Sequence, residues 1–265
     1  MLISALALAG CSSPEPVADP AKRPTIVSLN PCTDAILTEV AAPEQVLAIS
    51  HYSHNPGATS MDLAKARQFA TTGGTVEEVL ALQPDIVLAG SFLQPATQTA
   101  LDDLGIRVET FGIAATVEDS SEQIRRIAEL AGDPARSDAL IAQIEEALRK
   151  TEWQGETISA VLWQPAGIVP GEGALVSTLM QRTGFASHSA AKGMGQADYL
   201  SLEDMLADPP EVLMLAGHER SQQHPALAEL GPTMLADFDT SLLYCGGPTI
   251  IRVVERLHTI RESLR

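Results

Sequence analysis

One ten-residue pattern occurs twice in this chain, 126 positions apart. Residues 75–84 read TVEEVLALQP, and residues 201–210 read SLEDMLADPP. In both copies a proline ends a helical segment, and an aliphatic run typical of a buried parallel strand follows it. A helix-and-strand unit that is repeated in each half of a chain predicts two similar α/β lobes.

The segments around the repeat have the order that two such lobes need. Short β-rich runs alternate with helical patterns up to about residue 111 and again from residue 158, as expected for mainly parallel sheets. Between them the pattern is helical only, and its second half predicts a helix about 27 Å long. We therefore expect two α/β lobes joined by one long backbone helix, with an N-terminal lobe at 24–132, the connecting helix at 133–153 and a C-terminal lobe at 154–265.

The first 23 residues differ from the rest in composition. Residues 1–10 are apolar or small, and their junction with Cys11 resembles the lipobox of bacterial lipoproteins. Residues 12–23 are rich in Pro, Ala, Ser and Asp, as in a flexible tether. We expect a signal segment at 1–11 and a lipid on Cys11. The apolar run is short and no Lys or Arg precedes it, so either the start codon lies upstream or the match arises by chance.

Charge and motifs narrow the partners and the chemistry. The chain has 34 acidic and 17 basic residues and a formal net charge of -17, which disfavours nucleic acid as a partner. After the first residues no apolar run is long enough to span a bilayer, so we expect membrane contact through the lipid alone. Gly-x-Ser-x-Gly, phosphate-loop and His-Glu-x-x-His motifs are absent. We expect a binding protein without a cofactor rather than an enzyme.

Four segments resemble a known family. Residues 26–31 (IVSLNP), 72–74 (TGG), 76–85 (VEEVLALQPD) and 201–206 (SLEDML) are similar to the helical-backbone periplasmic binding proteins for vitamin B12, iron-siderophores and haem. The resemblance implies a solute-binding protein of an ABC importer, in the periplasm or at the cell surface, which hands a corrinoid or an iron chelate to permease subunits. Two alternatives remain open, a Zn or Mn importer component and a clamp-fold lipoprotein without a transport role.

Each copy of the repeat carries one carboxylate beyond those needed to cap its helix. The spacing assigns the capping role to Glu78 in the first copy and to Asp204 in the second. Glu77 and Glu203 are then free to point outward, and the resemblance implies that they pair with permease arginines. The alternative role is a favourable interaction with the helix dipole.

Most candidate ligand-binding residues lie where predicted strands end, because ligands bind beyond the carboxyl ends of parallel strands, here in a cleft between facing lobes. Tyr199 and Tyr244 lie just before predicted helices. His51 and His54 are also weak candidates for metal or haem iron, although no third ligand is identifiable and an ordinary polar loop is the alternative. Few basic residues are expected near the cleft, which favours a neutral ligand such as a corrinoid. The ligand-binding candidates are Asn30, Cys32, His51, Tyr52, His54, Trp163, Tyr199 and Tyr244.

Cys32 and Cys245 are predicted on loops that face one another across the cleft. Three arrangements are open: two separate thiols, a disulfide between the lobes, or thiolate ligands to a bound metal. We favour separate thiols, because a disulfide would lock a clamp that has to exchange its ligand.

Overall fold

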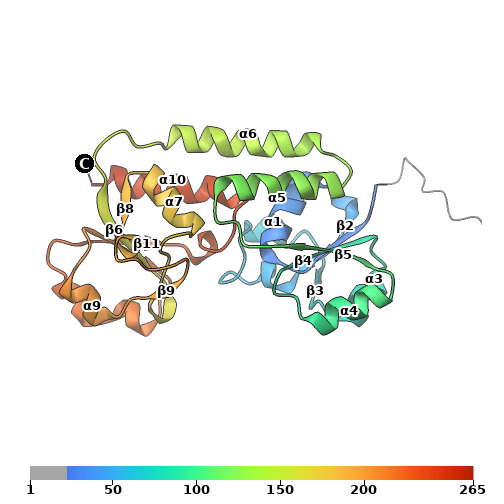
Figure 1. Cartoon of the computed structure of the whole chain (residues 1–265), viewed down its shortest axis with the longest axis horizontal. Helices are drawn as coiled ribbons and strands as arrows, with labels where there is room; N and C mark the ends of the chain where they lie inside the picture. The colour runs from blue at the N-terminus through green and yellow to red at the C-terminus, as the bar shows by residue number, and fades with distance from the viewer. Residues whose placement is uncertain (1–22, 265) are drawn as a thin grey trace, which may run out of the picture.

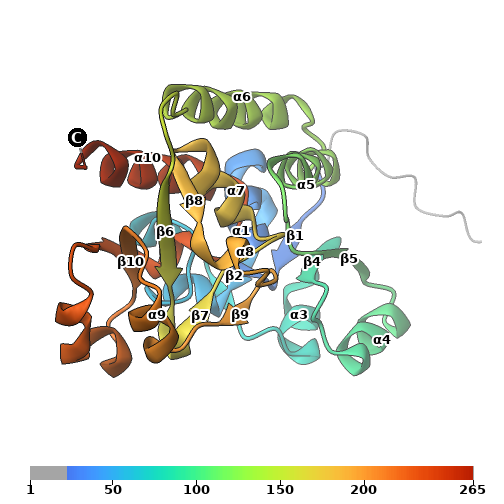
Figure 2. The same ribbon diagram turned by 60° about the vertical axis from the view of Figure 1, so that its left-hand side comes forward.

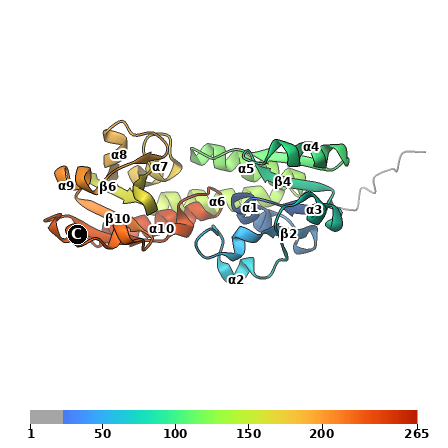
Figure 3. The same ribbon diagram turned by 90° about the horizontal axis from the view of Figure 1, so that it is seen from below.

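The computed structural model describes residues 23–264. The predicted signal segment, Cys11 within it and the tether up to residue 22 lie outside the described residues. Two α/β lobes lie side by side, as Figures 1 and 3 show. Within the described part of the chain, no helix is long and apolar enough to cross a membrane.

The N-terminal lobe contains a five-stranded parallel sheet in the order β3-β2-β1-β4-β5. A proline at the start of α1 and Asn30 at its N-cap fix the turn from the first strand into the first helix. The strands are β1 (Ile26–Ser28), β2 (Val46–Ser50), β3 (Thr71–Thr72), β4 (Ile86–Gly90) and β5 (Arg107–Phe111). The helices are α1 (Pro31–Val40), α2 (Leu63–Ala66), α3 (Val76–Leu82), α4 (Pro95–Asp103) and α5 (Val117–Leu130).

The C-terminal lobe contains a four-stranded parallel sheet in the order β11-β10-β6-β8. A separate two-stranded antiparallel sheet, β7 with β9, belongs to the same lobe and was not predicted. The strands are β6 (Ile158–Trp163), β7 (Ile168–Val169), β8 (Phe185–Ser187), β9 (Asp198–Tyr199), β10 (Val212–Ala216) and β11 (Met234–Phe238). The helices are α7 (Leu175–Arg182), α8 (His188–Ala191), α9 (Leu202–Ala207) and α10 (Thr249–Glu262).

One helix, α6 (Ala135–Lys150), connects the lobes. It lies along the top of both lobes in Figure 1 and over α5 and α10 in Figure 2. It packs against α1 and α5 of the first lobe and α10 of the second. Its 16 residues span about 24 Å, close to the length expected from the sequence.

Both sheets are covered on their two faces, so neighbouring residues of a strand enter different cores. In β1 Ile26 belongs to a large core that runs through both lobes, whereas Val27 belongs to a smaller core on the outer face. In β6 Leu162 belongs to the shared core, and Val161 and Trp163 belong to the outer core of their lobe. The shared core makes the lobes one packed unit at the α6 side.

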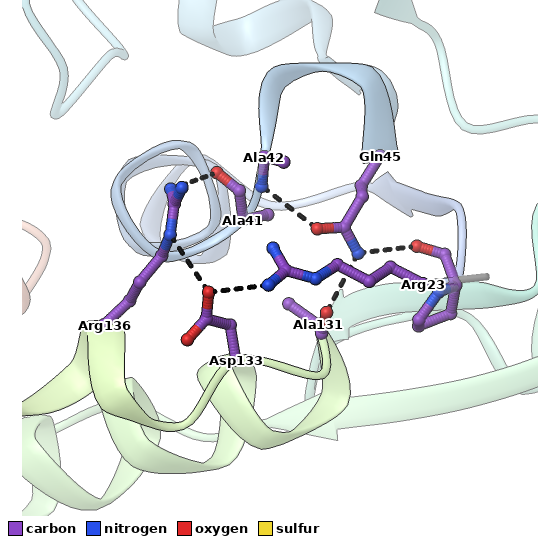
Figure 4. A network of polar contacts seen from close by, with 8 residues as sticks. Arg23, Ala41, Ala42, Gln45, Ala131, Asp133 and Arg136 are labelled. Atoms are coloured by element: carbon purple, nitrogen blue, oxygen red, sulfur yellow. Dashed lines mark hydrogen bonds and ion pairs between the residues drawn. The ribbon is translucent and has the colours of Figure 1, made fainter. Parts of the chain in front are cut away.

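A polar network fastens the first described residues to the turn between α5 and α6 (Figure 4). Asp133 accepts a hydrogen bond from Arg23 at 3.0 Å and lies 3.4 Å from the Nε of Arg136. Gln45 donates to the carbonyl of Ala131 at 2.9 Å. The chain therefore enters the N-terminal lobe on the side of α6.

Each lobe buries one ionisable side chain completely or nearly so. In α1, Asp34 is fully buried and accepts hydrogen bonds from the Ser50 amide at 3.0 Å and the Ser53 hydroxyl at 2.6 Å. Burial raises the pKa of Asp34 to about 8. In α10, Arg261 lies 4.0 Å from the ring of Trp153 and donates to the carbonyl of Glu156. The N-terminal lobe thus buries an acidic side chain, and the C-terminal lobe buries a basic one.

Candidate ligand-binding cleft

A pocket of about 490 Å³ lies between the lobes. The N-terminal lobe supplies residues that follow β1, β4 and β5, namely Asn30, Cys32, Phe92, Ile113 and Ala114. The C-terminal lobe supplies most of the wall, from the ends of β6 and β7, from α7, from the loop before β9 and from residues 242–245. The site thus lies beyond the carboxyl ends of the strands, where an open parallel sheet binds its ligands.

Large apolar side chains stand exposed around this pocket. Phe92 is 80% exposed, Ile113 57%, Tyr244 53% and Ile168 41%. A ligand that covers exposed apolar surface of this kind stabilises the complex by about 25 cal/mol per Å² of apolar area removed from water. The rim therefore favours a ligand with a broad apolar surface.

Among the described residues that line the pocket, none carries a formal charge. The polar side chains are Asn30, Gln164, Gln196 and Tyr244. Burial raises the pKa of the Tyr244 phenol, so this side chain remains neutral and can donate a hydrogen bond. The chemistry of the lining suits a neutral ligand with amide, carbonyl or hydroxyl groups.

Asn30 is positioned by its role as the N-cap of α1. Its Oδ1 accepts a hydrogen bond from the Cys32 amide at 2.8 Å. The other end of the amide lies over Gly90, where an added Cβ would come within 2.5 Å of Nδ2. Glycine at the end of β4 thus leaves room for the Asn30 side chain at the wall of the pocket.

Cys32 and Cys245 form a disulfide with their Cα atoms 5.1 Å apart. This corrects our preference for two separate thiols. The reason is the close packing between the loop before α10 and the N-terminal lobe, since Cβ atoms at Gly246 and Gly247 would meet Ser120 and Ile36. Cys32 is thus part of the pocket wall as half of a bond between the lobes.

The predicted site residues divide into those that the pocket includes and those that it does not. Asn30, Cys32 and Tyr244 line it. Tyr199 is 62% exposed and lies beyond the described pockets, although Gln196 and Ala197 of the same segment do line it. Tyr199 therefore lies two residues from the lining of this pocket, and its role in binding stays a prediction.

The segment that holds His51, Tyr52 and His54 does not line the pocket between the lobes. The rings of His51 and Tyr52 lie 4.1 Å apart, and the Nε2 of His54 is 3.0 Å from the Ala66 carbonyl. Residues 23–264 contain no group of three or more His, Cys, Asp or Glu side chains that could hold a metal ion. Among these described residues, His51 and His54 therefore have no third side chain nearby with which they could hold a metal ion.

Trp163 differs most from its predicted place. It is 2% exposed and belongs to the outer core of the C-terminal lobe, where its indole N–H donates to the Leu200 carbonyl at 3.1 Å. The reason is the alternation of side chains along β6, which points Trp163 away from the shared core and towards α9. We therefore leave Trp163 out of the candidate site.

Phe92 and Ile113 are the main lining residues that the sequence analysis missed. Each one comes just after a predicted strand, β4 or β5, and each is apolar in a loop. The rule that ligands bind beyond the carboxyl ends of strands could have identified both. The described lining contains no Lys or Arg, in agreement with the expectation of few basic residues near the cleft.

The repeated helices α3 and α9 each present one exposed carboxylate that has no partner among the described residues. Glu77 and Glu203 lie in the first turns and are exposed, and no hydrogen bond or ion pair between described residues involves either of them. Glu78, by contrast, accepts a hydrogen bond from Thr72 at 3.0 Å, which lowers its pKa. In Figure 1 α3 and α9 lie in the lower half of opposite lobes, away from α6.

Comparisons with known proteins agree with this architecture. The family model described as periplasmic binding protein matches residues 26–232. A haem-binding protein of Vibrio cholerae, HutB, superimposes with a TM-score of 0.73 at 16% identity, covering 89% of this chain and 98% of that one. A likeness at this identity supports the fold alone.

Two curated relatives match part of the chain. A cobalamin-binding protein of Halobacterium salinarum is 29% identical over 122 residues, which are 46% of this chain and 32% of that protein. An uncharacterized ABC transporter substrate-binding lipoprotein of Bacillus subtilis, YvrC, is 26% identical over 186 residues, covering 60% of this chain and 58% of that protein. The matches span less than two thirds of either relative.

Proposed function

The chain belongs to the periplasmic binding protein family, and from this premise we propose that it is the solute-binding component of an ABC importer. The family consists of solute-binding proteins rather than enzymes. The similarity to the Bacillus subtilis ABC transporter lipoprotein supports a role in import. The protein would capture a small molecule between its lobes and deliver it to permease subunits.

The ligand that fits the pocket best is a corrinoid. The observation that carries this proposal is the uncharged, largely apolar pocket between the lobes, with Phe92, Ile113, Ile168 and Tyr244 exposed around it. A corrinoid such as cyanocobalamin has a broad ring with neutral amide side chains, which Asn30 and other amides of the lining can bind. The similarity to a cobalamin-binding protein supports the same ligand class.

An iron chelate, haem in particular, is the second candidate. Tyr244 favours it, because a tyrosine oxygen can ligate haem iron and Tyr244 stands half exposed in the pocket. Two observations count against it. The raised pKa of Tyr244 disfavours the phenolate that iron prefers, and no charged residue of the described lining could pair with the haem carboxylates.

The two remaining alternatives have less support. A Zn or Mn carrier needs three or four N, O or S ligands, and the described residues bring together no such group. A clamp without a transport role would not require an exposed, unpaired carboxylate at the matching position of both copies of the repeat. Such a protein remains the outcome to consider if the titration below finds no ligand.

Glu77 and Glu203 are the proposed contacts with the permease. They occupy matching positions of the repeat, both are exposed, and the helix caps involve other side chains. Arginine side chains of a permease would form charge-assisted hydrogen bonds with them. One contact on each lobe would hold the protein with its cleft towards the permease.

We also propose that a lipid on Cys11 anchors the protein outside the cytoplasm. The lipobox-like junction at residues 8–11 and the lipoprotein description of the Bacillus subtilis relative support this proposal. Growth with radiolabelled palmitate should label the wild-type protein and leave Cys11→Ala unlabelled. Equal labelling of the two would contradict it.

Equilibrium titration tests the ligand proposal. The purified protein is titrated by calorimetry with cyanocobalamin, haemin, a ferric siderophore, Zn²⁺ and Mn²⁺ in separate experiments. We expect one equivalent of cyanocobalamin to bind and haemin to bind more weakly. Preference for haemin or a metal would overturn the corrinoid proposal, and binding of none of these would favour the clamp without transport.

A further inference from the structure

The disulfide lies within a second connection between the lobes, separate from α6. The loop before α10 reaches the N-terminal lobe, where the Gly247 amide donates to the buried Ser120 hydroxyl at 2.7 Å. The Thr249 hydroxyl donates to the carbonyl of Ser60 at 3.1 Å. We call residues 244–249 with Cys32, Ser60 and Ser120 the interlobe joint.

The joint lies between α6 and the pocket. Helix α6 packs against α1, α5 and α10, the same three helices that carry Cys32, Ser120 and Thr249. Cys32, Tyr244 and Cys245 of the joint line the pocket. In Figure 3 α10 of the C-terminal lobe and α1 of the N-terminal lobe follow one another along the middle of the molecule. The joint therefore forms the floor of the cleft.

We infer that the Cys32–Cys245 disulfide pins this floor and thereby sets the width of the cleft, which makes the pair a determinant of ligand size. A disulfide requires its Cα atoms to lie about 4.4–6.8 Å apart. The observed separation is 5.1 Å, so the floor can widen by about 2 Å at most. A hinge motion about α6 would have to separate these two atoms. The lobes can then twist or move at the rim, but the floor cannot open beyond this limit.

Amide hydrogen exchange tests the pinned floor without any ligand. In Cys32→Ser/Cys245→Ser we expect amides of residues 244–249 to exchange at least about 10-fold faster, because the joint can open locally. Exchange in α3 and α4 should not change. The matched control is Ser120→Ala, which removes one hydrogen bond of the joint and keeps the disulfide, with an expected change of about threefold or less. Folded wild-type protein treated with a phosphine reductant provides the same comparison if the double variant does not fold.

Unchanged exchange at the joint in both the double variant and the reduced protein would overturn the inference. The size-setting role rests on the proposed function and has its own test with cyanocobalamin and dicyanocobinamide, a smaller corrinoid. Discrimination between the two corrinoids is the ratio of the larger dissociation constant to the smaller one. We expect this ratio to fall about 10-fold or more when the disulfide is absent. An unchanged ratio would contradict the size-setting role. Absence of binding by either ligand would contradict the proposed function, and the exchange result would still decide whether the floor is pinned.

Discussion

The two lobes share a scaffold but contribute differently to the site. Each has a parallel sheet covered on both faces, and each presents a copy of the repeated helix with one exposed carboxylate that no described residue pairs with. The N-terminal lobe gives the pocket a few side chains on short loops, such as Phe92 and Ile113. The C-terminal lobe gives most of the wall, including the segments around the separate β7 and β9 pair. The surfaces proposed to contact the permease are alike in the two lobes, whereas the surfaces proposed to contact the ligand differ.

The largest expected effect tests what the lobes have in common. Reversing both charges in Glu77→Lys/Glu203→Lys should abolish uptake, because both contacts with the permease become repulsive, while ligand affinity stays unchanged. Either single reversal should reduce uptake only partly. The measurement is uptake of radiolabelled cyanocobalamin by cells that depend on this protein.

A matched control reverses two exposed glutamates on the opposite side of the molecule. Glu118 lies in the first turn of α5 and Glu145 on α6. Glu118→Lys/Glu145→Lys should transport like the wild type. If the control fails equally, or if the first double variant transports normally, the docking proposal is wrong.

The second effect concerns the buried ionisable side chains, Asp34 in the N-terminal lobe and Arg261 in the C-terminal lobe. The pKa of Asp34 is raised to about 8 in the folded protein, against 3.8 for the free side chain. The folded state therefore holds this proton more tightly, so the associated stability is complete below about pH 4 and is lost as the pH rises towards 8. Relative to Asp34→Asn, the wild type should lose about 1 kcal/mol of unfolding free energy per pH unit in that range. Urea unfolding at pH 5, 6.5 and 8 measures this difference.

Controls in both lobes sharpen the comparison. Asp103→Asn removes an exposed carboxyl of the N-terminal lobe and should leave the pH dependence unchanged. Arg261→Met in the C-terminal lobe should cost about 2–4 kcal/mol at every pH, since an arginine stays charged throughout. A parallel pH dependence of the wild type and Asp34→Asn would contradict the assignment to Asp34.

The third effect compares aromatic side chains from the two lobes. Tyr244→Ala should weaken cyanocobalamin binding about 10- to 100-fold, because it removes both a ring contact and a hydrogen-bond donor. Phe92→Ala removes a ring alone and should weaken binding about 3- to 10-fold. Calorimetric titration measures both, and Tyr244→Phe separates the hydroxyl from the ring. A larger loss at Phe92 than at Tyr244 would reverse the proposed division between the lobes.

The smallest effect is expected at Tyr52. This side chain lies outside the described pockets and against His51. Tyr52→Ala should change the dissociation constant for cyanocobalamin by less than about twofold, within the range of a surface substitution. A loss comparable to that of Tyr244→Ala would restore Tyr52 to the site.

The repeat allowed the two lobes and the two carboxylates to be predicted because they depend on local patterns. Thr75 and Ser201 cap their helices as expected, and the spacing of apolar residues gave the connecting helix α6. These features need information from only a few neighbouring residues. Asn30 lines the pocket as expected from the related rule that ligands bind beyond strand ends.

The remaining features depend on tertiary geometry. The disulfide joins residues 213 positions apart, and the pairing depends on how the loop before α10 meets α1. Trp163 was misplaced because the sequence does not tell which face of a strand points to which core when both faces are buried. The apolar wall from α7 looks in the sequence like any helix that packs in a core.

The central claim is that the ligand binds in the apolar cleft between the lobes, and a blocked cleft tests it most directly. Ala197 is exposed and lines the pocket, so Ala197→Trp should fill the site without disturbing the fold. Ala96→Trp on α4, outside the described pockets, is the matched control. In a calorimetric titration with cyanocobalamin we expect one equivalent to bind to the wild type and to Ala96→Trp, and affinity to fall at least about 100-fold in Ala197→Trp. Binding to Ala197→Trp with wild-type affinity would contradict the claim.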